Sequence, residues 1–522
     1  MSRSLIPDSP LLRAALEACA GRKTRVWLVG GAVRDALLGR PLHDLDLAVE
    51  RGAIEIAREA AARLGVPMYV LDAGRDTARI VAYDASGARV FLDFARLREA
   101  TLEADLAGRD FTINAMAMDP ARPERLIDPF GGQADLAARL VRATGDRSLL
   151  DDPIRLLRAA RQSLDLAFSI ESDTATRIRQ SAALIHAVSA ERVRDELMQI
   201  VARPAAHDSL RLLDQLNLLA EVLPELAAMR GVTQSSPHHW DVFEHTLRLL
   251  DLLERLLAQA IGIESQRRAQ SADAAPESAW VDVERALDPL RADMRDHLEK
   301  VLSDDRPAWH TLKWAALLHD AGKPVTRSIE PDGRIRFFGH EDVGAGLAAE
   351  RLRALRFSAS EIDRAAIIAR QHMLPHHLLD AERDPSRRAA YRFFRNTGEA
   401  VVDVLLLSLV DHLATYGPDL SPERWPQRLE WTRALLTEYF RRREETVHPP
   451  PLITGKDVMN LLGLQPGPRV GAVLEAVREA QAAGEVRTRE EALALVRTMN
   501  PRRDAPRAGD EPPSLPPGAG DE

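Results

Sequence analysis

The chain has 522 residues, of which 45% are hydrophobic and 29% are charged, enough for roughly three or four domains with cores of their own. The net charge of −9 excludes a nucleic-acid binder that depends on overall positive charge, so any such contact needs a local basic surface. The single cysteine, Cys19, excludes an internal disulfide framework, and the apolar runs are too short to span a membrane. We therefore expect a cytoplasmic protein with no membrane partner.

The first part of the chain alternates strand-like and helical segments. Helices are predicted at 32–38 and 54–65, where Gly39 and Gly65 provide the stop signals. Apolar runs and two-residue alternation between turn residues predict strands at 25–29, 44–50, 68–72, 78–84 and 88–94. This mixture predicts a small α/β domain.

From about residue 133 onward, apolar residues recur at the three- and four-residue spacing of helices. The fold class is therefore α+β, with a mostly helical remainder. The predicted parts are an α/β head at 1–140, a helical neck at 141–230, a helical domain at 231–440 with an insertion at 261–306, a C-terminal helical module at 441–500 and a disordered tail at 501–522.

Two acids, Asp44 and Asp46, stand two residues apart on the strand predicted at 44–50. Side chains at that spacing share one face of a strand, so the two carboxylates project together while Leu45 and Leu47 face the core. Carboxylates held so close repel one another unless a divalent cation lies beside them. Hard oxygen ligands suit Mg²⁺, which bridges substrate phosphates. An isolated Asp-x-Asp is also compatible with an ordinary edge strand whose acids are solvated.

A glycine pair, Gly30 and Gly31, ends the preceding strand and begins a helix. Glycines at that point let backbone N–H groups approach a triphosphate, and the helix N-terminus favours the anion. Arg34 lies one turn into this helix, where it could clamp a phosphate oxygen. Together with the acid pair, these residues predict a phosphate site rather than a solvated turn.

This combination, "GGAVRDALLGRPLHDLDL", resembles the signature of class II tRNA nucleotidyltransferases and bacterial poly(A) polymerases, in the DNA polymerase β superfamily. Four further elements resemble family motifs in the same order: "GRDFTINAMAMD" (108–119), "DPFGGQADL" (128–136), "DDPIRLLRAARQS" (151–163) and "SAERVRDEL" (189–197). The resemblance covers about residues 25–230. It identifies 1–140 as a nucleotidyltransferase head and 141–230 as a neck that binds the nucleotide base and RNA.

The resemblance implies an enzyme that adds C and/or A to RNA 3′ ends from CTP and/or ATP, with tRNA or another RNA as partner. Asp44 and Asp46 would hold Mg²⁺ as the catalytic acids. Gly30, Gly31 and Arg34 would bind the triphosphate, with Arg109 and Asn114 on the sugar and phosphates and Asp110 on the ribose 2′-hydroxyl. Asp152 and Arg155 would read the base, and Arg158 would contact the triphosphate or the RNA end.

Three positions leave room for other interpretations. Asp152 precedes Pro153, which also predicts a helix N-cap, and capping need not exclude base reading. Gly108 stands where the family motif has an arginine, which removes one candidate phosphate or sugar contact. Asp93 is a candidate third carboxylate by analogy with the superfamily, or a strand-end aspartate.

Histidines and aspartates form a second set in the helical half. His245, His319-Asp320 in "HDAGKP", His340, His372 and Asp411 occur in an order that resembles the HD phosphohydrolase superfamily, an all-α fold. The resemblance implies that His245, His319, Asp320 and Asp411 hold a divalent transition metal (manganese, nickel, cobalt, zinc or iron), and Lys323 is a candidate phosphate contact. His340 and His372 are candidates for a second metal or the phosphate. His238, His239, His376 and His377 are flanked by proline or tryptophan and are interpreted as ordinary residues.

The sequence therefore favours an RNA 3′-end nucleotidyltransferase with an appended HD domain. The same motifs serve CCA-adding, CC-adding and A-adding enzymes and poly(A) polymerases, so that choice stays open. Other hypotheses are a metal-dependent phosphohydrolase with a degenerate RNA-binding head, and a non-catalytic RNA-binding protein. Intact Asp44, Asp46, Asp110 and Arg155 argue against both. No pattern sets the oligomeric state or the role of 261–306.

Overall fold

The structure is a computed structural model that describes residues 10–42, 44–83, 87, 89–263, 276–381, 386–447 and 449–499. The predicted tail at 501–522 lies outside these residues. The chain divides into two compact units, which are described separately here. Unit 1 comprises Met1–Ala227 with Ala354–Arg356, and unit 2 comprises Ala228–Arg353 with Phe357–Glu522.

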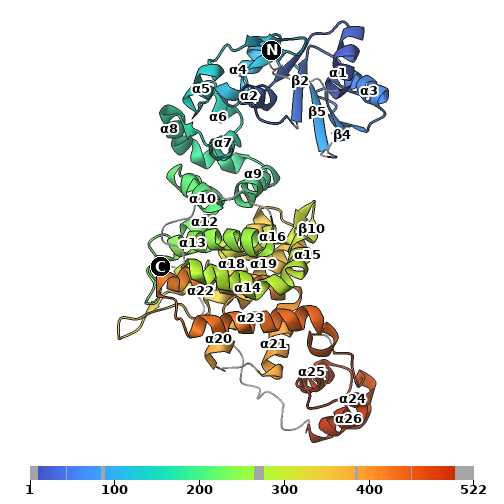
Figure 1. The fold of residues 1–522 in the computed structure, drawn as a ribbon, viewed down its shortest axis with the longest axis vertical. Helices are drawn as coiled ribbons and strands as arrows, with labels where there is room; N and C mark the ends of the chain where they lie inside the picture. The colour runs from blue at the N-terminus through green and yellow to red at the C-terminus, as the bar shows by residue number, and fades with distance from the viewer. Residues whose placement is uncertain are drawn as a thin grey trace, which may run out of the picture. The chain divides into compact units, whose positions relative to one another are not determined.

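Unit 1 begins with a sheet and continues as helices, which confirms the predicted change from α/β to helical structure (Figure 1). Its helices are α1 (Pro10–Gly21), α2 (Gly31–Leu37), α3 (Ala53–Leu64), α4 (Leu102–Ala107), α5 (Gly132–Ala138), α6 (Ser148–Asp151), α7 (Arg155–Leu166), α8 (Ser172–Ser181), α9 (Ala190–Ala202), α10 (Ala206–Gln215), α11 (Leu219–Val222) and α12 (Pro224–Ala227). Short 3₁₀ turns, η1 (Thr112–Asn114) and η2 (Ala182–Ala187), lie between them.

The main sheet of unit 1 has the strand order β3-β4-β5-β2-β1-β6-β7. Its strands are β1 (Val26–Val29), β2 (Asp44–Val49), β3 (Met68–Asp72), β4 (Thr77–Tyr83), β5 (Arg89–Arg96), β6 (Ala117–Asp119) and β7 (Arg122–Ile127). Two further short strands, β8 (Leu140–Val141) and β9 (Ser169–Ile170), pair with each other. Strands β2 and β5 run parallel, whereas their other neighbours are antiparallel.

The alternation in β2 decides which side chains reach the open face of the sheet. Leu45 and Leu47 are buried, while Asp44 is exposed and Asp46 is half-buried, as the two-residue period predicts. Helix α3 packs against α1 and against β4 and β5, and Figure 1 shows α1 and α3 together on one side of the sheet. The acids therefore project from the face of β2 opposite to the one that carries the buried Leu45 and Leu47.

Unit 2 is mostly helical. Its helices are α13 (Val242–Arg255), α14 (Glu277–Leu287), α15 (Arg291–Glu299), α16 (Ala308–Leu318), α17 (Lys323–Thr326), α18 (His340–Ala354), α19 (Ala359–Gln371), α20 (Leu374–Ala381), α21 (Arg387–Thr397), α22 (Val401–Tyr416), α23 (Arg424–Arg441), α24 (Gly455–Leu462), α25 (Pro468–Ala482) and α26 (Arg489–Thr498). Two small hairpins pair β10 (Val301–Ser303) with β11 (Arg306–Pro307) and β12 (Ser328–Ile329) with β13 (Ile335–Arg336).

The described part of the predicted insertion, from residue 276 onward, belongs to the helical core of unit 2. Trp280 and Val283 of α14 and Met294 and Leu298 of α15 are buried. Helix α14 packs on α23, and α15 packs on α16. These residues therefore act as core-forming elements.

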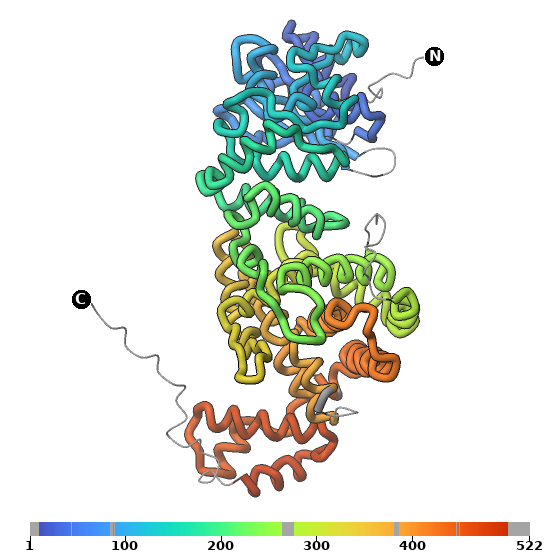
Figure 2. The backbone as a smooth tube through the Cα atoms, turned by 90° about the vertical axis from the view of Figure 1, so that its left-hand side faces the viewer, coloured from blue at the N-terminus to red at the C-terminus, as the bar shows by residue number. Residues whose placement is uncertain are grey.

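The last three helices, α24 to α26, have a core of their own, centred on buried Val458, Val477 and Val496 (red in Figure 2). Helix α21 contacts α25, where Arg388 and Arg392 pair with Glu479.

One helical stretch, Arg387–Asp419, is long and apolar enough to cross a membrane by length and composition alone. Within its most apolar window, 89% is buried inside the protein. The core helix of a soluble protein passes the same test, so this stretch is weak evidence for a membrane span.

Candidate functional site

Three aspartates meet on the open face of the unit 1 sheet. The parallel register of β2 and β5 places Asp46 opposite Asp93, and Arg79 of β4 is the next residue in the same row. Arg79 donates two hydrogen bonds to Asp93, at 2.8 and 2.7 Å. Burial, and then repulsion from Asp93 and Asp44, raises the pKa of Asp46 to about 6, although Arg109 and Arg79 act in the opposite direction. A cation bound beside these three carboxylates would offset their mutual repulsion.

Gly30 lies directly beside these acids. A methyl group at this position would lie 2.8 Å from Arg109 Nη1 and 3.3 Å from Asp46 Oδ2, and the φ angle of +71° is one that glycine tolerates best. The end of β1, Asp46 and the Arg109 guanidinium therefore lie together. The Nε atom of Arg109 is buried and has no hydrogen-bond partner among the described residues.

Arg34 projects from α2, the helix that Gly31 begins. Its guanidinium donates to both oxygens of Asp35, at 3.0 and 2.8 Å, and to Asn114 Oδ1 at 2.8 Å. It also lines a cavity of about 330 Å³, together with Asp35, Arg40, Pro41 and Asp165. Arg34 is therefore held in one orientation beside a space that a ligand group can enter.

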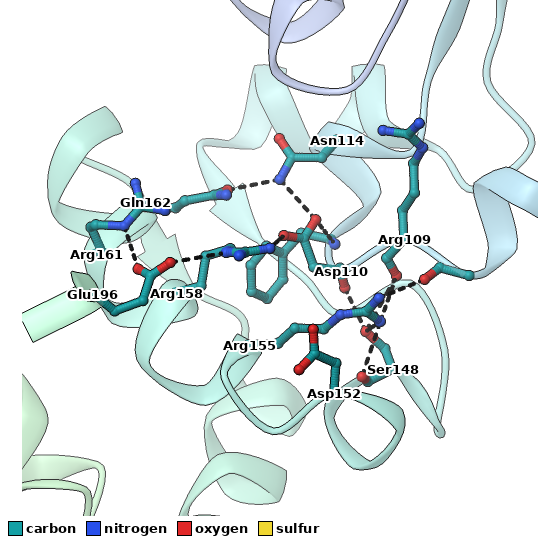
Figure 3. A network of polar contacts seen from close by, with 12 residues as sticks. Arg109, Asp110, Asn114, Ser148, Asp152, Arg155, Arg158, Arg161, Gln162 and Glu196 are labelled. Carbon is teal, nitrogen blue, oxygen red and sulfur yellow. Dashed lines mark hydrogen bonds and ion pairs between the residues drawn. The ribbon is translucent and has the colours of Figure 1, made fainter. Parts of the chain in front are cut away.

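Asp110 and Asn114 lie at the two ends of one turn and are both buried. Asp110 Oδ1 accepts hydrogen bonds from the Phe111 amide and from Asn114 Nδ2, each at 2.9 Å. Asn114 Nδ2 also donates to Gln162 Oε1 of α7 at 2.9 Å (Figure 3). The turn predicted to hold the sugar is therefore tied to a helix far along the chain.

Arg158 of α7 joins the same network. Its guanidinium contacts Asp110 Oδ2 and Glu196 Oε1, each at 3.3 Å, and Glu196 Oε2 accepts from Arg161 at 2.6 Å (Figure 3). Burial lowers the pKa of Arg158, but Asp110 and Glu196 more than offset this effect, and the net pKa lies above its usual value. Arg158 is thus partly committed to protein partners.

Arg155 occupies a different environment from the one predicted. Its guanidinium is buried and donates to the backbone carbonyls of Gly108 at 2.7 Å, Ser148 at 3.0 Å and Arg109 at 3.3 Å (Figure 3). It therefore fastens the segment that carries Arg109 and Asp110.

Asp152 does not cap a helix. Helix α7 begins at Arg155, and Ile154 occupies the N-cap position without a side-chain hydrogen bond, so the N-cap prediction was wrong. Asp152 has an extended backbone, and its carboxylate pairs with Arg192 of α9 at 2.8 Å. Pro153 is followed by one more turn residue before the helix starts, which moves the cap position away from the aspartate.

The predicted histidines and aspartates of unit 2 come together although they are spread over more than 160 residues of sequence. His245 lies on α13, His319 and Asp320 follow α16, His340 begins α18, His372 follows α19, and Asp411 lies on α22. All six side chains are buried. His245 with His319 and Asp411, and His319 with Asp320 and His372, form two groups whose ligand atoms lie within 4.8 Å of one another.

The histidine rings are oriented by backbone carbonyls. Nδ1 lies 2.8 Å from the Ala316 carbonyl in His319, 2.8 Å from the Phe337 carbonyl in His340, and 2.6 Å from the Ala369 carbonyl in His372. A carbonyl accepts only, so each Nδ1 carries the proton. This tautomer leaves the lone pair on Nε2, the arrangement found in metal-ligating histidines.

All three Nε2 atoms face Asp320. They lie 3.2 Å (His319), 3.5 Å (His340) and 3.8 Å (His372) from its carboxylate oxygens. His319 Nε2 and His340 Nε2 are buried and have no hydrogen-bond partner within the described residues, while Asp320 Oδ2 is paired with Lys323 Nζ at 2.7 Å. When these rings are neutral, their Nε2 lone pairs and the Asp320 carboxylate form a buried donor set of the kind that binds a divalent metal.

The second carboxylate of the cluster, Asp411, contacts a histidine that is not among the predicted ligands. Asp411 Oδ1 lies 3.0 Å from His245 Nε2, and Oδ2 lies 3.2 Å from His376 Nε2. His376 was interpreted as an ordinary residue because Pro375 precedes it. Its position four residues after His372 was the signal that could have identified it.

The pKa values of the aspartates in this cluster shift in the opposite direction from that of Asp46. Burial acts to raise the pKa values of Asp320 and Asp411, but neighbouring cationic groups hold both well below their usual range. For Asp320 these are His319 and Lys323, whose Nζ lies 2.7 Å from Oδ2, and for Asp411 they are His245 and His376. Both carboxylates stay ionised and available as ligands.

Family models match four stretches of the chain. "Poly A polymerase head domain" matches residues 26–142, and "Probable RNA and SrmB- binding site of polymerase A" matches 167–230. "HD domain" matches 293–415, and "tRNA nucleotidyltransferase domain 2 putative" matches 434–496. These matches confirm both resemblances predicted from the sequence. Nucleotidyltransferase and HD domains typically use divalent metals, and the histidine–aspartate groups described above are possible ligands.

Curated relatives cover nearly the whole chain. An A-adding tRNA nucleotidyltransferase from Deinococcus radiodurans is 38% identical over 90% of this chain and 94% of its own length. A CC-adding tRNA nucleotidyltransferase from Thermus thermophilus is 35% identical over 92% and 95%. Among solved structures, a CCA-adding enzyme in complex with CTP has a TM-score of 0.58, with 20% identity over 94% of this chain and 96% of that one, and shares the fold.

Proposed function

Because the chain belongs to the tRNA nucleotidyltransferase family, we propose that it adds C, A or both to the 3′ end of tRNA, with CTP or ATP as donor and Mg²⁺ at Asp44 and Asp46. The observation that carries this proposal is the convergence of Asp46, Gly30 and Arg109 on one face of the sheet. The acids are the hard oxygen ligands that Mg²⁺ prefers, and burial together with repulsion from Asp93 and Asp44 raises the pKa of Asp46, so its ionised form would be stabilised by added positive charge. A metal ion brought with the triphosphate would supply that charge.

The reaction forms a bond between the RNA 3′-oxygen and the α-phosphorus, while the bond to pyrophosphate breaks and the hydroxyl proton leaves to solvent. Mg²⁺ at the acid pair would activate the hydroxyl and neutralise the leaving group. Gly30 leaves room for the triphosphate beside Asp46, while Arg34 and Arg109 offer donors to its oxygens. Asp110 offers an acceptor to the ribose 2′-hydroxyl.

Base selection is assigned to the region around Asp152. Its carboxylate side chain is 30% exposed, so it can accept from the amino group of C or A. Arg155 contributes indirectly, because its donors hold the carbonyls of Gly108 and Arg109. We propose the same domain boundaries that the sequence predicts. We also propose that the reaction takes place in the cytoplasm.

The test uses purified protein, Mg²⁺, labelled CTP or ATP, and tRNAs that end before, within and after CCA. Addition of two C residues, of one A, or of CCA would each support the proposal and identify the version. Long A tails on any RNA would instead support a poly(A) polymerase. Failure to incorporate either nucleotide would overturn the proposal.

We also infer a second activity, hydrolysis of a phosphoester in unit 2. The observation that favours it is the set of three histidines around Asp320, whose rings are oriented by backbone carbonyls so that each Nε2 faces this carboxylate. His245, His319, Asp320 and Asp411 would hold a divalent transition metal, and His340 and His372 would hold a second metal or the phosphate. Such a metal would lower the pKa of a bound water, which would supply the oxygen that bonds to phosphorus while the P–O bond to the alcohol breaks.

This second activity is tested with a generic phosphomonoester and a 2′,3′-cyclic nucleotide in the presence of Mn²⁺, Co²⁺ or Ni²⁺. Release of phosphate or opening of the ring would support it. Stoichiometric metal with no hydrolysis of either ester would leave the centre a structural role and contradict the proposed activity.

A further inference from the structure

Gln162 is a buried polar residue that the nucleotidyltransferase site does not use directly. It lies on α7, and its Oε1 accepts a hydrogen bond from Asn114 Nδ2 at 2.9 Å. Figure 3 shows it beyond Asn114, on the far side from Arg109. Gln162 therefore accepts one hydrogen bond, from the Asn114 amide, and any effect of Gln162 on the site acts through Asn114.

The hydrogen-bonding capacity of Asn114 is committed to protein partners. Both of its amide hydrogens are used, one on Asp110 and one on Gln162, and its oxygen accepts from Arg34. Asn114 is only 6% exposed. It therefore has no N–H to offer a nucleotide, and its part in the site is to hold Arg34 and Asp110.

The network also fixes the polarity of each amide. Arg34 can only donate and the Asp110 carboxylate can only accept, so Asn114 must turn its oxygen to Arg34 and its nitrogen to Asp110. Gln162 must then present its oxygen. Without this acceptor, Asn114 has a buried N–H with no partner, and rotation of the amide to regain one would release Asp110 or Arg34.

The same face of α7 makes two more contacts with this segment. Arg155, Arg158 and Gln162 lie at positions i, i+3 and i+7, which share one side of a helix. Arg155 holds the carbonyls of Gly108 and Arg109, and Arg158 contacts Asp110 Oδ2. Of the three, Gln162 is uncharged and reaches the side chain that links Asp110 to Arg34.

We propose that Gln162 is a positioning residue that sets ribose selectivity and triphosphate binding through Asn114. The proposal rests on the proposed function, in which Asp110 faces the ribose 2′-hydroxyl and Arg34 faces the phosphates. Gln162 touches neither group of the nucleotide. It keeps the acceptor and the cation in register with each other, so that one nucleotide satisfies both.

The test compares Gln162→Met, which keeps the approximate volume but loses the acceptor, with Gln162→Glu, which keeps an acceptor. For Gln162→Met we expect the preference for ATP over dATP, or for CTP over dCTP, to fall roughly tenfold in kcat/KM, mainly through KM. Gln162→Glu should retain most of the wild-type preference. The matched control is Ser163→Ala, because Ser163 is buried on the same helix and its hydroxyl donates to the Phe168 carbonyl at 2.6 Å, away from Asn114 and Asp110. It should lower the melting temperature without changing the preference.

A binding measurement separates failure of this inference from failure of the proposed function. The rise in melting temperature with Mg²⁺ and ATP is compared with the rise with Mg²⁺ and dATP, without RNA. We expect a larger rise with ATP in the wild type and equal rises in Gln162→Met. An unchanged ATP preference in Gln162→Met, or the same loss in Ser163→Ala, would overturn the inference even if incorporation proceeds. Equal rises in the wild type would overturn it as well.

Discussion

The acid pair of unit 1 and the histidine–aspartate centre of unit 2 both contain aspartates that are partly or fully buried, but the pKa values of these aspartates shift in opposite directions. Around Asp46, burial together with repulsion from Asp93 and Asp44 outweighs the effect of the two arginines, and the pKa of Asp46 rises to about 6. Around Asp320 and Asp411, histidines and a lysine outweigh the burial, and both pKa values fall. The first arrangement suits a metal that arrives with a phosphate substrate, and the second suits a metal that stays bound.

The two sites also differ in how the chain assembles them. Asp44 and Asp46 lie on one strand, and a single parallel register brings Asp93 beside them. The unit 2 centre takes residues from α13, α18, α20 and α22 and from the segments that directly follow α16 and α19. A site built from one strand depends on local geometry, whereas a site built from many helices depends on the packing of the whole unit.

The largest effects are expected when the carboxylate of each site is removed. Asp46→Ala should lower nucleotide incorporation at least about a thousandfold and leave the metal content of unit 2 unchanged. Asp320→Ala should remove the tightly bound metal of unit 2, measured by atomic absorption after dialysis, and leave incorporation nearly unchanged. Loss of both properties in either variant, with an unchanged melting temperature, would contradict the independence of the two sites.

A matched pair of glycines compares the two forms of assembly. A methyl group at Gly322 would lie 2.1 Å from the His340 carbonyl oxygen, a backbone atom that cannot move aside. Gly322→Ala should therefore separate α18 from His319-Asp320 and markedly lower both the melting temperature and the metal content. At Gly30 the nearest atom is the end of the flexible Arg109 side chain, so Gly30→Ala should lower incorporation roughly tenfold to a hundredfold through a displaced guanidinium and a strained φ.

Both glycine variants are measured under the same conditions, by thermal unfolding and by assays of the two activities. The comparison would fail if Gly30→Ala destabilised the protein more than Gly322→Ala, or if Gly322→Ala kept its metal. Gly346 of α18, where an added methyl group meets nothing within 4 Å, provides the control for the substitution itself.

Local features of both sites followed from the sequence, because they depend on periodicity. The two-residue alternation placed Asp44 and Asp46 together, and helix stop signals placed Gly39 and Gly65 after α2 and α3. The order of His245, His319, Asp320 and Asp411 identified the second cluster, since each lies on or directly after a helix.

Other features depend on where separate elements meet, which no spacing encodes. The use of Arg155 on backbone carbonyls requires α7 to lie against residues 108–109. The contact of His376 with Asp411 requires α20 to lie against α22. The link from Gln162 to Asn114 spans 48 positions in sequence. In each case tertiary packing gives a side chain its partner, and the residue type alone was compatible with several roles.

The contrast between buried and open charge extends to the ion pairs. In unit 2, Arg364 contacts Asp403 at 2.5 Å and His297 at 2.6 Å, and Asp403 is fully buried. Burial acts to raise the pKa of Asp403, but Arg364 and His297 hold it below its usual value. Arg364→Met leaves this carboxylate without its main partner and should lower the free energy of unfolding by about 3–5 kcal/mol at pH 7.

The pH dependence of that loss has a definite sign. A lowered pKa in the folded state contributes stability above the unfolded aspartate pKa of about 4, and the contribution disappears as the pH falls through the folded value. The difference between wild type and Arg364→Met, measured by urea unfolding, should therefore shrink as the pH falls from 7. A difference that grew with acidification would contradict this account.

The smallest effect is expected at the open pair of Asp152 and Arg192 in unit 1. Their side chains are 30% and 50% exposed, so solvent screens the interaction, and Arg192→Ala should cost only about 0.5 kcal/mol of stability. Burial acts to raise the pKa of Asp152, and the hydrogen bond from Arg192 and its charge bring it below its usual value. The small loss should therefore be present at pH 7 and shrink as the pH falls below about 4 and through the lowered pKa of the folded carboxylate. If Asp152 reads the base, freeing it from Arg192 should also change the ratio of kcat/KM for CTP and ATP. A changed ratio with nearly unchanged stability separates a residue that contacts the nucleotide from one that only joins α9 to the turn before α7, because loss of a purely structural pair would lower both kcat/KM values equally.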